Sequence, residues 1–216
     1  MKLSIYNGSP RGKGSNSDVF ADMLMAGFGG SAEISKHYVK DTAKHDEIIN
    51  DISDCYFVVF PLYADTTPYG VKVFFEKMEE RKEIYAGKPI YFFIHSGFPE
   101  AKQSRLLERY LKYFCTIIGA ECRGVCIMGN SEGMRNMKKE SKKYAKVQSC
   151  MNSFAQDILM NRPLNEDGIK YFHAMETMPK PALFIFRRLP GMVNMGFDMM
   201  IKKMGAYENR FDKPYA

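Results

Sequence analysis

The chain has 216 residues, of which 45% are hydrophobic and 26% are charged, and its formal net charge is +6. These values are typical of a globular protein with one sizeable core. No uninterrupted apolar run approaches the ~20 residues of a membrane-spanning helix. The apolar run before Asn7 is too short for the core of a secretory signal peptide.

The hydrophobic pattern alternates between short runs typical of buried strands and longer runs with helical spacing. We expect strands at residues 2–7, 33–39, 55–63, 88–96 and 120–128, and helices at residues 17–28, 45–53, 68–81, 104–119 and 137–160. This alternation predicts an α/β fold with a doubly wound, five-stranded parallel sheet and right-handed crossovers. The breaker-rich sequence NRPLNEDG then predicts a boundary between a domain of residues 1–162 and a mostly helical extension, residues 163–216.

The distribution of charged residues, cysteines and histidines argues against a nucleic-acid-binding, a disulfide-rich or a metal-binding protein. Basic residues are spread along the chain, and we interpret the densest run, KKESKK at 138–143, as a solvated helix face rather than a nucleic-acid site. The five cysteines are odd in number and scattered, which favours reduced thiols and a cytoplasmic location. We expect Cys122 and Cys126 to share one face of the fifth strand and to be unrelated thiols. The four histidines show no metal-ligand spacing, and we expect His95 to be structural.

The loop NGSPRGKGSNS, residues 7–17, holds three glycines, three serines and two basic residues. Its position between the first strand and the first helix is where doubly wound folds bind anions. The loop does not match the triphosphate-binding motif GxxxxGK[ST], because Gly12-Lys13 follows Gly8 one residue too early. It does not match the dinucleotide motif GxGxxG either, because Ser17 replaces the third glycine. The sequence is consistent with a loop that wraps a monophosphate such as that of FMN. The alternative is a turn in which Ser15 or Ser17 only caps the first helix, and this alternative leaves Arg11 without a role.

Two further loops follow buried strands at the same edge of the predicted sheet. The sequence PLYADTTPYG begins at Pro61, and HSGFPEA ends the fourth strand with a flexible Gly97 and an aromatic Phe98. Each loop could be an ordinary turn between a strand and a helix. Three such loops at one edge favour a site for a flat aromatic ring linked to a phosphate.

The sequence resembles the NAD(P)H-dependent FMN reductases, a branch of the flavodoxin-like proteins. The resemblance covers about residues 1–160 and depends on two motifs, GSPR-x-x-x-SN[ST] at Gly8–Ser17 and PLY-x-x-x-x-P at Pro61–Pro68. It implies the strand order 2-1-3-4-5 and FMN as cofactor. The compact cysteine motif of the iron–sulfur flavoproteins on this fold is absent from the sequence.

The resemblance also implies which residues bind each part of FMN. The phosphate would contact Ser9, Arg11, Ser15, Asn16 and Ser17. The isoalloxazine ring would be bordered by Pro61, Leu62, Tyr63, Ala64 and Asp65, together with Ser96, Gly97 and Phe98. Backbone N–H groups of residues 63–66 or 96–98 would stabilise the charge of the reduced ring.

The function that we expect is that of an oxidoreductase. NADH or NADPH would pass a hydride through FMN to a small-molecule acceptor such as a quinone or a flavin, and no side chain is named as catalytic because the flavin carries the chemistry. A flavodoxin-type electron-transfer carrier for a protein partner and a non-catalytic FMN-binding module remain as alternatives. We expect a homodimer or higher oligomer, no metal, and a methionine-rich tail at 182–204 that packs on a subunit or over the flavin rather than on a membrane.

Overall fold

The structure is a computed structural model that describes residues 1–173, 175–188, 190–203 and 205–212. The chain divides into two units, Met1–Thr177 and Met178–Ala216. Leu189 and Met204 of the methionine-rich stretch and residues 213–216 lie outside the described residues.

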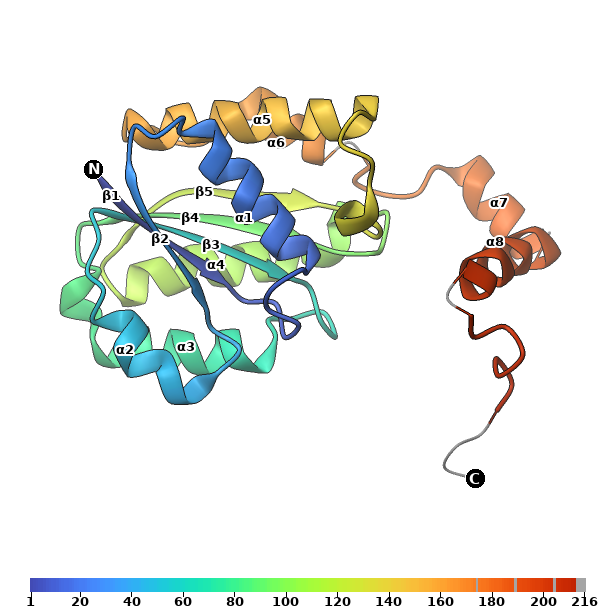
Figure 1. The fold of residues 1–216 in the computed structure, drawn as a ribbon, viewed down its shortest axis with the longest axis horizontal. Helices are drawn as coiled ribbons and strands as arrows, with labels where there is room; N and C mark the ends of the chain where they lie inside the picture. Colours follow the sequence, from blue (N-terminus) through green and yellow to red (C-terminus); the bar gives the residue numbers. More distant parts are fainter. Residues whose placement is uncertain (174, 189, 204, 213–216) are drawn as a thin grey trace. The chain divides into compact units, whose positions relative to one another are not determined.

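The first unit contains a five-stranded parallel sheet with the order β2-β1-β3-β4-β5 (Figure 1). Its strands are β1 (Lys2–Asn7), β2 (Glu33–Tyr38), β3 (Cys55–Pro61), β4 (Pro89–His95) and β5 (Glu121–Met128). Order and direction confirm the predicted flavodoxin-like sheet.

Helices cover both faces of this sheet, as Figure 1 shows. They are α1 (Asn16–Gly27), α2 (His45–Ile49), α3 (Tyr69–Glu80), α4 (Arg105–Ile117), α5 (Lys142–Leu159) and α6 (Glu166–Phe172). Residues of α1, α5 and α6 belong to one apolar core, and residues of α2, α3 and α4 belong to the other. In β3, Phe57 and Val59 face the first core while Val58 and Phe60 face the second, so the strand is apolar at every position.

Strand β5 contains a bulge that changes the expected position of its cysteines. Ile90 pairs with Cys122 but Tyr91 pairs with Gly124, so that Arg123 is an extra residue in the ladder. Cys122 therefore packs against the core formed by α2, α3 and α4, while Cys126 lies in the core formed by α1 and α5. The prediction that the two cysteines share a face was wrong, because it assumed an unbroken two-residue period.

Helix α5 begins later than residue 137, the start that we predicted. The hydroxyl of Ser141 accepts a hydrogen bond of 3.2 Å from Tyr144 N and so caps the helix. The basic run at 138–143 consequently straddles the helix start, and only its last two residues are helical.

The boundary between the two units lies after Thr177, whereas the sequence placed it after residue 162. Leu164 and Phe172 are buried in the core formed by α1 and α5. Arg105 of α4 binds both carboxylate oxygens of Glu176, at 2.9 and 2.5 Å. Residues 163–177 are thus a part of the sheet unit.

The second unit contains α7 (Lys180–Arg188) and α8 (Pro190–Lys203), which pack against each other. The Tyr207 ring lies 4.4 Å from Lys202 Nζ and 3.7 Å from the Arg210 guanidinium carbon. Among the described residues, no helix is both long and apolar enough to cross a membrane.

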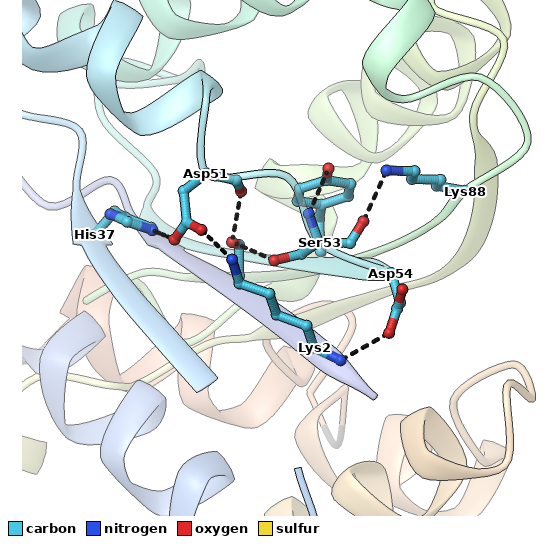
Figure 2. Close-up of polar contacts among 8 residues, drawn as sticks. Lys2, His37, Asp51, Ser53, Asp54 and Lys88 are labelled. Carbon is cyan, nitrogen blue, oxygen red and sulfur yellow. Dashed lines mark hydrogen bonds and ion pairs between the residues drawn. The ribbon is translucent and has the colours of Figure 1, made fainter. Parts of the chain in front are cut away.

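A polar network joins β1 and β2 to the segment that precedes β3 (Figure 2). The Asp51 carboxylate pairs with Lys2 Nζ and with His37 Nε2, the latter at 2.8 Å, and the Ser4 and Ser53 hydroxyls are 2.8 Å apart. Lys88 donates a hydrogen bond of 2.8 Å to the Ser53 carbonyl. These contacts fix the segment before β3 and the orientation of the His37 ring.

Candidate functional site

A polar pocket lies at the carboxyl ends of β1, β3, β4 and β5, where doubly wound sheets bind their ligands. Four loops form it: the β1 loop (8–15), the β3 loop (62–68), the β4 loop (96–104) and the β5 loop (129–141). The residues that line it are Ser9, Arg11, Ser15, Asn16, Pro61, Leu62, Tyr63, His95, Ser96, Gly97, Ser131, Glu132 and Arg135.

The β1 loop turns sharply before it enters α1. Gly12 and Gly14 have φ angles of +69° and +73°, which glycine adopts without strain. Ser15 caps α1 by accepting a hydrogen bond of 3.1 Å from Asp18 N, so its own hydroxyl proton remains able to donate. The first N–H groups of α1, including those of Asn16 and Ser17, have no intrahelical acceptor. The loop therefore presents the positive end of a helix to the pocket.

Asp18 holds this loop in place from behind. Its carboxylate accepts hydrogen bonds of 2.8 Å from Gly14 N, Lys36 Nζ and the Tyr38 hydroxyl. Burial raises the pKa of Asp18, but the bonds from Lys36, Gly14 and Tyr38 outweigh it, so the pKa lies below the usual value. The carboxylate is thus ionised and is compensated within the protein.

His95, the last residue of β4, connects the start of α1 to the β5 loop. Its Nε2 lies 2.8 Å from the Ser17 hydroxyl, and its Nδ1 lies 3.0 Å from the Ser131 hydroxyl. Burial lowers the pKa of His95 to about 3, so the ring is neutral. Ser131 donates its one hydroxyl proton to the Ser96 carbonyl at 2.8 Å. It must then accept from Nδ1–H, which leaves Nε2 to accept from Ser17.

Asn16 links the β1 loop to the β5 loop. Its amide nitrogen donates to the Ser131 carbonyl at 3.1 Å, and its amide oxygen accepts from Arg135 N at 2.9 Å. Both ends of the Asn16 side chain are thus engaged within the protein. These bonds bring Glu132 and Arg135 to the pocket, two residues that sequence reasoning missed.

A tight turn forms the tip of the β3 loop. Tyr63 N donates to Thr66 O at 3.0 Å, and Thr66 N donates to Tyr63 O at 2.9 Å. Between them, Ala64 and Asp65 adopt φ angles of +45° and +60°, as in a type I′ turn. The pocket lining on this loop ends at Tyr63, and Ala64 and Asp65 form the exposed apex of the turn.

The β4 loop is braced against the β5 loop. Asn130 N donates to the Phe98 carbonyl at 2.7 Å, and a Cβ atom on Gly129 would lie only 2.4 Å from the Pro99 carbonyl oxygen. Among the described residues, the N–H groups of Gly97 and Phe98 have no hydrogen-bond acceptor. The Tyr63 and Thr66 N–H groups are engaged in their turn, and Ala64 and Asp65 do not line the pocket. Of the two segments expected to supply donors, the β4 loop therefore has unengaged N–H groups at the pocket.

The pocket contains nine of the thirteen residues that the sequence analysis selected. The other four are Ser17, whose hydroxyl bonds His95; Ala64 and Asp65, at the turn apex; and Phe98, whose side chain is 56% exposed. Among the described residues, no group of three or more His, Cys, Asp or Glu side chains could hold a metal ion.

Solved structures with the same architecture identify the fold of this protein. No protein-family model and no curated protein matches the sequence. A flavodoxin from Pseudomonas aeruginosa (its C101A mutant) superimposes with a TM-score of 0.50 and 12% identity, over 72% of this chain and 97% of that one. The chain is therefore a flavodoxin-like α/β protein.

Two reductases share this fold. An NADH:FMN oxidoreductase (EMOB), in its apo form, aligns with a TM-score of 0.57 and 17% identity over 84% of this chain and 98% of that one. An FMN-dependent NADH-azoreductase from Bacillus anthracis, in complex with FMN, aligns with a TM-score of 0.55 and 12% identity over 73% and 98%. At these identities the likeness concerns the fold.

Proposed function

We propose that the protein binds FMN in the pocket at the carboxyl end of the sheet and acts as an NAD(P)H-dependent oxidoreductase. The observation that carries the proposal is the chemistry of the β1 loop. Ser9 is only 4% exposed, and no described residue bonds its hydroxyl. Because Ser9 lines the pocket, this hydroxyl is available to a ligand there as a hydrogen-bond donor.

The donors of the β1 loop suit a monophosphate. The Ser9 and Ser15 hydroxyls, the Arg11 guanidinium and the N-terminus of α1 all border the pocket. A terminal phosphate carries about 1.5 to 2 negative charges, and these groups can compensate it without a metal ion. Ser17 contributes through its backbone and by fixing the loop, because its hydroxyl donates to His95.

The remaining walls suit a flat ring. Pro61, Leu62 and Tyr63 offer apolar and aromatic surface on one side, and Ser96 and Gly97 lie on the neighbouring strand end. The free N–H groups of Gly97 and Phe98 can donate to an oxygen or nitrogen atom on which negative charge develops. FMN, when bound, supplies the redox chemistry: it accepts a hydride from a reduced nicotinamide and delivers two electrons to an acceptor such as a quinone.

The neutral His95 ring excludes one mechanistic role. Both of its nitrogens are hydrogen-bonded within the protein, and its pKa of about 3 prevents the ring from taking up a second proton near neutral pH. His95 positions the loops, and the pocket needs no acid or base from this residue.

Anaerobic titration of the FMN-loaded protein with NADH and NADPH tests the proposed activity. We expect loss of the oxidised flavin absorbance with at least one nucleotide, and its return on addition of a quinone. Reduction by a reductase protein but by neither nucleotide would instead indicate an electron carrier. Flavin binding without turnover with any donor or acceptor would indicate a non-catalytic module.

A further inference from the structure

A second hollow lies at the end of β2, next to the proposed FMN site. Lys13 of the β1 loop lines it together with Tyr38, Lys40 and Lys44, and His37 and Ile48 also belong to its lining. It shares no lining residue with the pocket described above. We call it the β2 groove.

Three of the lysines in the β2 groove lack a carboxylate partner. Lys36, the fourth, is neutralised by Asp18 at 2.8 Å and Asp22 at 2.5 Å. Among the described residues, no carboxylate lies within ion-pair distance of Lys13, Lys40 or Lys44. Four lysines on helix surfaces elsewhere do have such partners, namely Lys72, Lys77, Lys112 and Lys170.

Acidic residues do not remove the positive character of the groove. Asp41 and Glu47 also line it. The Asp41 carboxylate caps the turn at Thr42–Lys44 by accepting a hydrogen bond of 3.3 Å from Ala43 N. The groove thus has three unpaired lysines and two carboxylates, and one of these carboxylates is engaged in a cap. Its net positive charge suits an anion.

The walls of the groove are fixed by contacts within the fold. The Lys40 side chain crosses Gly12 so closely that a Cβ atom there would lie 3.0 Å from Lys40 Cε. The Tyr38 hydroxyl donates to Asp18. The His37 ring is hydrogen-bonded to the Asp51 carboxylate (Figure 2). The groove therefore offers anchored rings beside its ammonium groups.

We propose that the β2 groove binds the 2′-phosphate of the adenosine half of NADPH and makes the protein prefer NADPH to NADH. The proposal rests on the proposed function, because the nicotinamide must reach the ring site at the β3 and β4 loops. The order β2-β1-β3-β4 separates β2 from β4 by three strand spacings, about 14 Å. An extended dinucleotide can follow the sheet edge over such a span.

NADPH and NADH differ at the 2′ position of the adenosine ribose, and the groove would distinguish them there. A phosphate monoester there carries about 1.5 to 2 negative charges and presents three acceptor oxygens to the lysines. The hydroxyl of NADH carries no charge and leaves the three ammonium groups without a partner. The groove thus discriminates by charge compensation at a site remote from the flavin.

Calorimetric titration with adenosine 2′,5′-bisphosphate and with 5′-AMP tests the groove without any turnover. We expect the bisphosphate to bind at least tenfold more tightly than AMP, and this preference to be lost in the double variant Lys40→Gln/Lys44→Gln. The matched control Lys82→Gln removes an exposed lysine that precedes β4 and does not line the groove, and it should keep the preference.

The same variants are then compared by the ratio of kcat/KM for NADPH to that for NADH. The ratio should fall at least tenfold in the double variant and stay constant in Lys82→Gln. Equal affinity for the two adenosine nucleotides, an unchanged ratio, or equally tight binding of inorganic phosphate alone would overturn the groove proposal. Failure to bind FMN would instead refute the proposed function, whatever the titration with the bisphosphate shows.

Discussion

The Ser17 hydroxyl donates a hydrogen bond of 2.8 Å to Nε2 of His95, a residue 78 positions away in the sequence. His95 in turn donates from Nδ1 to Ser131, so one buried ring joins the start of α1 to the ends of β4 and β5. The geometry of the proposed FMN pocket therefore depends on a residue whose two ring nitrogens are both hydrogen-bonded within the protein.

Replacing His95 tests this dependence through stability. His95→Leu leaves the Ser17 hydroxyl without an acceptor and Ser131 without a donor, and each unsatisfied buried group costs about 1–3 kcal/mol. We expect the free energy of unfolding, measured by urea denaturation of the FMN-free protein, to fall by roughly 2–6 kcal/mol. His95→Asn can still donate to Ser131 and should lose less. Equal stability of the two variants would show that the bridge has no such role.

The pH dependence of stability follows from the same residue. The pKa of His95 is lowered to about 3, below the value of about 6.5 of an unfolded histidine, so the unfolded chain binds an extra proton between these two values. Stability contributed by His95 is present above pH 6.5 and is lost as the pH falls, by at most about 1.4 kcal/mol per unit. Urea denaturation at pH 7.5 and 5.0 should show a steeper loss for the wild type than for His95→Asn. Parallel losses would contradict the buried neutral ring.

Arg11 and Lys13 should differ in their effect on FMN affinity, although both belong to the β1 loop. Arg11 lines the pocket, while Lys13 lines the β2 groove. A hydrogen bond to a charged group contributes about 1.5–3 kcal/mol, so Arg11→Gln should raise the Kd for FMN by roughly 10- to 100-fold. Lys13→Gln should leave that Kd within about twofold. Quenching of flavin fluorescence measures both, and a larger effect of Lys13 would place the phosphate elsewhere.

Gly129 is required where the β4 and β5 loops meet. A Cβ atom on this residue would lie 2.4 Å from the Pro99 carbonyl oxygen and 3.0 Å from that of Phe98. We expect Gly129→Ala to lower the free energy of unfolding by about 1–3 kcal/mol, since the two loops must separate. Gly191→Ala is the matched control, because a Cβ atom on Gly191 meets no atom of the described residues within 4 Å. Equal stability of the two variants, measured by thermal unfolding, would contradict the close packing of the loops.

The sheet could be predicted from the sequence because its signal is local. Continuous apolar runs such as that of β3 arise when both faces of a strand are buried. The spacing of the glycines and serines in the β1 loop likewise predicts an anion site. The bulge at Gly124 had one local signal, an isolated glycine within a strand, which the assumption of a regular strand overlooked.

The β5 loop could not be predicted, because it reaches the pocket only through tertiary contacts. Asn16 and Arg135 are 119 positions apart, and no motif marks Ser131 or Glu132. The direction of the Ser17 hydroxyl could not be predicted either, because it depends on its hydrogen bond to His95. A sequence pattern selects the residue types near a site, whereas hydrogen-bond partners decide which of them face the ligand.

A direct comparison of FMN with riboflavin tests the central claim, that the β1 loop is a monophosphate site and the neighbouring loops hold a flavin ring. The two ligands share the ring and differ in the phosphate. Titrated into the flavin-free protein and followed by fluorescence quenching, FMN should bind at least 100-fold more tightly than riboflavin. Equal affinity for the two, or no binding of FMN, would contradict the account.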